Sequence, residues 1–148
     1  MSEIIRIEEI QVPFDGLAKF KRDAASEEYG FVETLVDEWK SGEMCFDKSG
    51  EKFLGASWKD HVIGLGGISV DQYLNEARVG RLKHIYVLKK FRRLGAARML
   101  VTNLLEGAST HFEIIRLRVA NEYASRLYEQ FGFVPTVDPD ASHILRLG

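Results

Sequence analysis

The feature that most restricts the fold is an alternation of strand and helix patterns in the second half of the chain. Residues 79–87 (VGRLKHIYV) predict a strand, which runs through a basic loop into an amphipathic helix that starts near Leu94. Residues 113–119 predict another strand, followed at once by a helix over about 122–131 that Gly132 ends. This order predicts a sheet covered by helices, with a helix-linked crossover between two of its strands.

The first half of the chain predicts antiparallel strands and two helices. The remaining expected elements are, in order, a strand over 3–10, two helices within 14–40, strands over 51–58 and 62–70, and final strands over 133–137 and 142–147. Gly30 separates the two helices and Gly42 ends the second. Lys59 and Asp60 predict a tight turn, and the glycines at 64–67 predict a bulge or a close backbone approach. Together these elements form an α/β mixture whose first half is mostly antiparallel.

Length and composition exclude several classes of protein. The 148 residues correspond to about one domain, expected over 1–148, and 45% hydrophobic with 28% charged residues exclude a disordered chain, a collagen-like repeat and a coiled coil. No apolar run can span a bilayer and the N-terminus lacks a signal-peptide pattern, so we expect a cytoplasmic protein with no membrane partner. A single cysteine, Cys45, excludes an internal disulfide and a four-cysteine zinc site. No histidine and carboxylate group has metal-ligand spacing, so no metal is expected.

The charge is distributed unevenly along the chain. Residues 1–80 carry nine basic and sixteen acidic side chains, whereas residues 81–148 carry eleven basic and six acidic ones. Seven basic residues and no acidic residue lie between Arg81 and Arg98. A local positive field of this kind attracts polyanions, either nucleic acid or a phosphorylated small molecule. The alternative is a solvated basic face with no ligand.

The loop before the helix that starts near Leu94 has the features of a phosphate site. Free backbone N–H groups at a helix start bind anions, and the helix dipole adds to this preference. Gly95 lets the backbone approach a phosphate closely, and the small Ala97 permits close packing. The counter-charges available nearby are Lys89, Lys90, Arg92, Arg93 and Arg98. The segment therefore predicts a pyrophosphate site, with an amphipathic helix behind a basic loop as the alternative.

These residues resemble a known family. The pattern Arg92-x-x-Gly95-x-Ala97 after a strand is similar to the acetyl-CoA signature of the GNAT superfamily of N-acyltransferases. A second match follows the strand over 113–119 and consists of Asn121, Ala124, Leu127, Tyr128, Gly132 and Phe133. The resemblance implies an α/β (α+β) fold over nearly the whole chain, with a mixed, mostly antiparallel sheet of six to seven strands and about four flanking helices. It is firm from Val79 to Phe133 and loose before Trp58.

The resemblance also implies roles for individual residues, with acetyl-CoA as co-substrate. The backbone of Ile85, Tyr86 and Val87 would bind the pantetheine arm. The pyrophosphate would lie on the segment Arg92, Arg93, Leu94, Gly95, Ala96, Ala97 and Arg98. Asn121 would contact the cofactor arm, and Tyr128 would protonate the leaving thiolate as general acid, although an aromatic residue at this spacing also fits a core position.

The sequence departs from the family at the positions where the general base is often found. Arg81 and Arg116 occupy the positions at which members often carry a glutamate, and an arginine cannot act as a base at neutral pH. A primary amine with a pKa near ~10.4 is neutral in only about one molecule in two thousand at pH 7, so a proton acceptor is needed. His84 is the nearest candidate, with a structural histidine as the alternative. The period of two along the strand predicts that His84 faces away from Arg81, Ile85 and Val87.

Arg81 and Arg116 also suggest the class of acceptor. If both face the cleft, they would favour an amine that carries a carboxylate or phosphate, such as an amino-acid-like molecule. The alternative is that both pair with surface acids.

The sequence therefore predicts an acetyl-CoA-dependent N-acetyltransferase that acts on a small-molecule primary amine by direct attack in a ternary complex. Cys45 lies far from the motifs, which argues against an acetyl-cysteine intermediate. A catalytically silent acyl-CoA sensor on the same fold is the alternative, and its main support is the missing base. A nucleic-acid module is not expected, because only Tyr86 and Phe91 offer aromatic rings in the basic segment. A homodimer is considered because dimers are common among relatives, while the acyl-chain length and the acceptor stay open.

Overall fold

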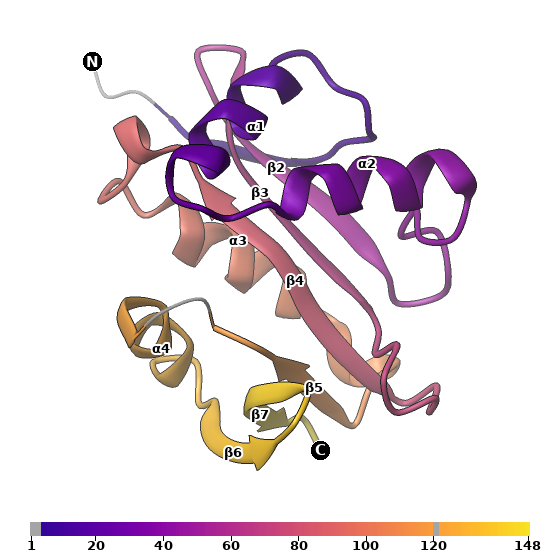
Figure 1. Cartoon of the computed structure of the whole chain (residues 1–148). Coiled ribbons are helices and arrows are strands. Elements are labelled where there is room, and N and C mark those ends of the chain that lie inside the picture. The colour runs from indigo at the N-terminus through magenta and orange to yellow at the C-terminus, as the bar shows by residue number, and fades with distance from the viewer. Residues whose placement is uncertain (1–3, 120–121) are drawn as a thin grey trace.

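The computed structural model describes residues 4–119 and 122–148, which form a seven-stranded sheet with helices on both faces (Figure 1). The helices in these residues are α1 (Leu17–Ser26), α2 (Phe31–Ser41), α3 (Ala96–Leu105) and α4 (Glu122–Glu129). The strands are β1 (Arg6–Glu9), β2 (Lys52–Trp58), β3 (His61–Val70), β4 (Val79–Val87), β5 (Ile114–Leu117), β6 (Val134–Asp138) and β7 (Ala141–Arg146). The strand order is β1-β2-β3-β4-β5-β7-β6, and each neighbouring pair is antiparallel except β4 and β5. The mixed, mostly antiparallel sheet that the sequence predicts is confirmed.

The predicted elements are present, with small changes at their ends. Strand β4 has the predicted bounds, and Lys59 and Asp60 both have the positive φ angles, 49° and 64°, of a tight hairpin turn. Helix α3 begins later than predicted because residues 89–91 form a short 3-10 turn and Gly95 caps the helix at φ 86°. Strand β5 is shorter than predicted, since it leaves the sheet after Leu117.

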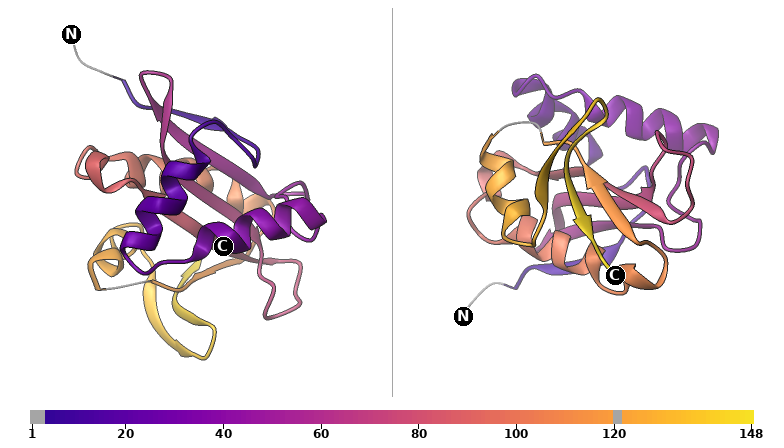
Figure 2. Two further views of the ribbon diagram at one scale, coloured as in Figure 1. Left: turned by 45° about the horizontal axis from the view of Figure 1, so that its top comes forward. Right: turned by 90° about the horizontal axis from the view of Figure 1, so that it is seen from below.

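Each face of the sheet is covered by its own pair of helices (Figures 1 and 2). Helices α1 and α2 place Phe20 and Leu35 in an apolar cluster with side chains of β2, β3 and β4. Helix α3 buries Leu100 and Leu104 on the opposite face, in a second cluster that also contains Tyr128 of α4. Burial of these aliphatic and aromatic side chains is the main stabilising contribution to such a layered fold.

A β-bulge interrupts the pairing of β3 with β4 at the predicted glycine run. Lys83 pairs with Gly67 and Tyr86 with Leu65, so His84 and Ile85 together lie opposite Gly66. His84 has φ 61°, a left-handed conformation that is uncommon for residues other than glycine. Glycine suits this position, because a Cβ on Gly66 would lie 2.6 Å from Cδ1 of Ile85 and that side chain would have to shift. The bulge predicted for residues 64–67 is therefore confirmed.

Strands β4 and β5 pair over only three residues and then separate. Their parallel register runs from Val79 with Ile114 to Arg81 with Arg116. At this last pair, Asp71 lies between the two guanidinium groups, with Oδ2 at 3.3 Å from Nη1 of Arg81 and 3.1 Å from Nη1 of Arg116. Both arginine side chains are at most 9% exposed and that of Asp71 is fully buried, so the carboxylate balances two charges removed from water.

Asp71→Asn is expected to lower the free energy of unfolding by about 3–5 kcal/mol, because two buried guanidinium groups lose their shared carboxylate. Urea unfolding followed by circular dichroism measures this loss. Asp140→Asn is the matched control, since Arg81 contacts only the backbone oxygen of Asp140. Equal stability of the two variants would contradict the role of Asp71.

Candidate functional site

Two cavities open where β4 and β5 separate, and they meet at four residues. The larger cavity, about 850 Å³, lies beside the start of α3, and the smaller, about 350 Å³, lies beneath α2. Both are lined by Tyr29, Ile85, Ala124 and Tyr128. Two ligands, one bound in each cavity, would therefore meet at these shared residues.

The larger cavity presents unpaired backbone donors at the start of α3. The first backbone bond of the helix joins the N–H of Met99 to the carbonyl oxygen of Gly95, so the N–H groups of Ala96, Ala97 and Arg98 have no acceptor within the helix. No side chain caps this helix end, and no atom lies within 4 Å of the place where a Cβ on Gly95 would be. The segment fits the pyrophosphate of acetyl-CoA, as the sequence predicts.

Most other predicted cofactor residues also line the larger cavity. They are Ile85, Tyr86, Val87, Arg92, Arg93, Gly95, Ala96, Ala97 and Arg98. Leu94 does not line it and is 56% exposed. Asn121 lies outside the residues that the structure describes.

Arg92 holds the loop rather than standing free as a counter-charge. Its Nη1 and Nη2 donate to the two carboxylate oxygens of Glu27 at 2.9 and 2.6 Å, and its Nε donates to the carbonyl oxygen of Val87 at 2.9 Å. Tyr86 donates a third hydrogen bond to Glu27, at 2.7 Å. The Arg92 guanidinium is the main reason that the pKa of Glu27 falls to about 2. Glu27 therefore ties the end of α1 to the cofactor loop, which leaves Arg93 and Arg98 as the remaining basic side chains of this cavity.

The smaller cavity has a basic lining without acids. Among its described lining residues the charged side chains are Arg81, Lys83 and Arg118, and no aspartate or glutamate is present. Phe31, Leu117 and Val119 supply apolar surface. This lining favours an anionic or neutral ligand and disfavours a polycation.

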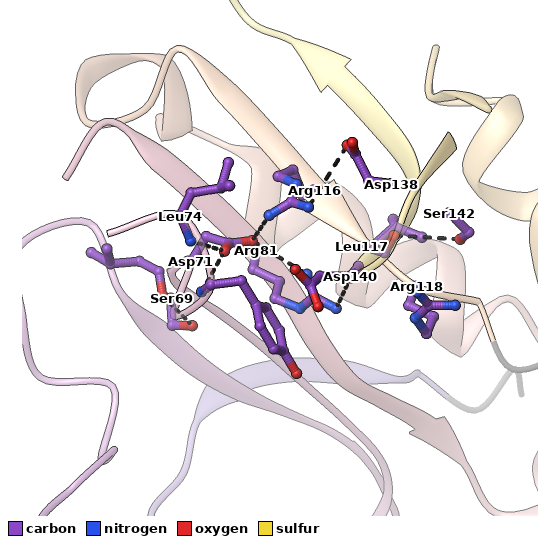
Figure 3. Close-up of polar contacts among 12 residues, drawn as sticks. Ser69, Asp71, Leu74, Arg81, Arg116, Leu117, Arg118, Asp138, Asp140 and Ser142 are labelled. Atoms are coloured by element: carbon purple, nitrogen blue, oxygen red, sulfur yellow. Dashed lines mark hydrogen bonds and ion pairs between the residues drawn. The ribbon is translucent and has the colours of Figure 1, made fainter. Parts of the chain in front are cut away.

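The two arginines expected to select the acceptor are both held by Asp71 (Figure 3). Arg81 also donates to the backbone oxygen of Asp140 at 2.7 Å and lies over the ring of Tyr73. Arg116 is 3% exposed and does not line the smaller cavity. The acid that the two arginines share is thus buried, while Arg116 has a second partner at the surface, since its Nη2 lies 3.8 Å from Oδ2 of Asp138, whose side chain is 45% exposed. The main role of the pair is structural.

The predicted orientation of His84 relative to Arg81 is wrong, because the bulge shifts the alternation of β4. Leu82, Ile85 and Val87 face the α3 side, whereas Lys83 and His84 both face α2. His84 therefore lines the same cavity as Arg81, although it does lie opposite Ile85 and Val87, as predicted.

His84 is a poor proton acceptor in this position. Its ring stacks on Phe31 with centroids 5.5 Å apart, and Nε2 is buried without a hydrogen-bond partner among the described residues. Burial, with the adjacent charge of Lys83, lowers the pKa of His84 to about 3. A general base works best with a pKa near the operating pH, so this environment argues against that role.

Tyr128 lies where the two cavities meet. It projects from α4 and its ring meets Phe133 edge to face at 5.8 Å. Burial raises the pKa of its phenol, so the hydroxyl stays protonated at neutral pH and can donate a proton or hydrogen bond. Tyr128 is thus a core residue, and its role as general acid stays a prediction.

The sequence reasoning missed three residues of the site. Tyr29 lines both cavities from the connection between α1 and α2, Glu27 holds the cofactor loop, and Lys83 faces the smaller cavity. An aromatic residue beside Gly30, at a break between two helices, was a usable signal for Tyr29. Nothing local marks Glu27, because its partner lies 65 residues away.

Within residues 4–119 and 122–148, no group of three or more histidine, cysteine or carboxylate side chains is placed to hold a metal ion. In the same part of the chain, no helix has the length and apolar character needed to cross a bilayer.

The pKa of His84 predicts a specific pH dependence of stability. Between pH 6.5 and about 3 the unfolded chain binds a proton at this histidine and the native state does not, so acid destabilises the fold. Unfolding free energies of the wild type should fall over pH 6.5 to 4.5 more steeply than those of His84→Asn, by up to ~1.4 kcal/mol per pH unit. Asparagine tolerates positive φ. His61→Asn, at an exposed position, is the control, and parallel profiles for wild type and His84→Asn would refute the expectation.

Comparisons with known proteins agree with this geometry. A family model described as an acetyltransferase (GNAT) domain matches residues 18–146. A crystal structure from Exiguobacterium sp. 255-15, described as an acetyltransferase, has a TM-score of 0.83 and 25% identity over 97% of this chain and 93% of that one. No curated protein gives a significant match.

Two more distant structures share the fold. A GNAT-family acetyltransferase from Staphylococcus aureus Mu50 has a TM-score of 0.75 at 16% identity, covering 98% of this chain and all of that one. PaiA N-acetyltransferase from Thermoplasma acidophilum, solved in complex with coenzyme A, has a TM-score of 0.67 at 18% identity, covering 99% of this chain and 100% of that one. The family model covers most of the chain, and the chain therefore belongs to the GNAT acetyltransferase family.

Proposed function

We propose that the whole chain acts as one N-acetyltransferase domain, which transfers the acetyl group of acetyl-CoA to a primary amine of a small, anionic, amino-acid-like molecule. The observation that carries this proposal is the pair of cavities that meet at Tyr128, one beside the free amides of α3 and one with a basic lining. Two cavities that meet can hold donor and acceptor together, which supports direct attack in a ternary complex. Cys45 lines neither cavity, so an acetyl-cysteine route lacks a nucleophile in the described lining.

Each part of the site has a task in this mechanism. The amides of Ala96 to Arg98 bind the pyrophosphate, and the β4 backbone from Ile85 to Val87 holds the arm of the donor. Acetyl-CoA supplies an activated thioester when bound. Tyr128 donates its proton toward the sulfur as negative charge develops there. No carboxylate lines the smaller cavity among the described residues, so in this mechanism the amine proton passes to water, and Tyr128 regains a proton from water after transfer.

The basic segment from Arg81 to Arg98 does not form one nucleic-acid surface. Arg81 is buried against Asp71, Lys83 faces a cavity, and Arg92 is bound by Glu27. A small-molecule acceptor, without nucleic acid, is therefore the proposed partner. A cytoplasmic location and a homodimer remain predictions.

Acetyl-CoA binding is testable by thermal shift. A ligand that binds only the native state raises the melting temperature, so acetyl-CoA and CoA should do so while ATP has little effect. Ala97→Asp should keep the fold, because an acidic residue suits a helix N-terminus, yet lose the shift by repelling the pyrophosphate. An unchanged shift in Ala97→Asp, or none at millimolar acetyl-CoA in the wild type, would place the cofactor elsewhere.

Tyr128→Phe tests the proton donor. Thiol release from acetyl-CoA with a library of amines should show kcat about 10²-fold lower in the variant, while CoA binding is retained. Tyr73→Phe, at a half-exposed tyrosine outside both cavities, is the matched control. A wild type that binds CoA but releases no thiol with any amine would favour the silent acyl-CoA sensor, and full activity in Tyr128→Phe would remove the general acid from the mechanism.

A further inference from the structure

Lys83 differs from the other basic side chains of the smaller cavity. Arg81 is bound by Asp71 and the backbone of Asp140, and Arg118 donates to the backbone oxygen of Pro139. Lys83 forms no hydrogen bond or ion pair within the described part of the chain, although it is half-buried. It is therefore the cavity's one unpaired cation among the residues that the structure describes.

The regular pairing of β4 with β3 just before the bulge determines where Lys83 points. Lys83 pairs with Gly67, and a Cβ on that glycine would lie 2.5 Å from the ring of Phe46, on the face covered by α2. The positive φ of His84 places its own imidazole on this same face. The ammonium of Lys83 and the imidazole of His84 therefore both line the cavity wall. The acid with the largest favourable effect on the Lys83 ammonium is Glu38 of α2, which forms no ion pair with it within 4.0 Å and does not line the cavity.

An ammonium group that is partly removed from water without a counter-ion is costly. Burial lowers the pKa of Lys83; the charge of Arg81 acts in the same direction, whereas Glu38, Glu51 and Asp71 oppose it. A carboxylate or phosphate in the cavity would remove this cost and form a charge-assisted hydrogen bond. No acidic side chain from the described lining competes for that place.

We propose that Lys83 binds the anionic group of the acceptor and is the residue that makes the enzyme prefer acidic over neutral amines. This inference rests on the proposed acetyl transfer and assigns the acceptor's carboxylate or phosphate to Lys83 instead of Arg81 and Arg116. The neighbouring apolar wall of Phe31, Leu117 and Val119 would contact the rest of the acceptor.

The test compares acceptors that differ only in charge. Phenylalanine with phenylalaninamide, and phosphoethanolamine with ethanolamine, are assayed by thiol release with the wild type, Lys83→Met, Lys83→Arg and the exposed control Lys48→Met. Lys83→Met should lower kcat/KM for the acidic member of a pair by about 10- to 100-fold and leave the neutral member unchanged. Lys83→Arg should retain the preference, because it keeps the charge. Far-UV circular dichroism confirms that each variant is folded.

A binding measurement separates this inference from the proposed function. Calorimetric titration of CoA-saturated protein with N-acetylphenylalanine and its amide should show that the wild type binds the acid more tightly and that Lys83→Met loses this difference. If no amine releases thiol, the proposed transfer fails, yet this titration still decides the role of Lys83. A wild type without preference for the acid, or a Lys83→Met variant that keeps it, overturns the inference. If Lys83→Met and Lys83→Arg both lower kcat/KM equally for acidic and neutral acceptors, the inference is also overturned. That result would indicate that Lys83 acts as a proton acceptor instead.

Discussion

The site depends on one buried carboxylate, that of Asp71, placed between two arginines of neighbouring strands. Arg81 and Arg116 are opposite each other in the last paired position of β4 and β5, where two guanidinium groups would otherwise repel. Asp71 also accepts the backbone N–H groups of Tyr73 and Leu74, which fixes the loop that precedes β4. The paired end of β4 and β5 is therefore held in place. Beyond it the two strands can separate around the two cavities while the sheet stays intact.

A second constraint is the bulge at His84. A single extra residue in β4 moves the histidine onto the face that Lys83 and Arg81 already share by regular alternation, so the imidazole joins the wall of the smaller cavity. The same bulge leaves Ile85, Tyr86 and Val87 along the larger cavity. One local irregularity thus lies between the part of β4 that lines the smaller cavity and the part that lines the larger one.

The sequence predicted those parts of the fold that local patterns encode. The bounds of β4, the glycine bulge and the open helix start at Gly95 follow from residue types a few positions apart. The face of His84 did not follow, because the phase of a strand after a bulge depends on which residue adopts positive φ. Arg81 and Arg116 were recognised as unusual, but their shared partner Asp71 depends on the three-dimensional placement of a loop.

Two unfavourable local features adjoin each other at the wall of the smaller cavity. His84 has a left-handed backbone and a buried nitrogen without a described partner, and beside it Lys83 has an ammonium without a described counter-ion. Elsewhere in the site the charges are matched, as for Glu27 with Arg92 and Asp71 with two arginines. The described residues leave the imidazole and the ammonium at this wall without a polar partner, and a ligand can supply one. Binding an anion at this wall would supply a partner that no described residue provides, so the electrostatics and the geometry favour the same cavity.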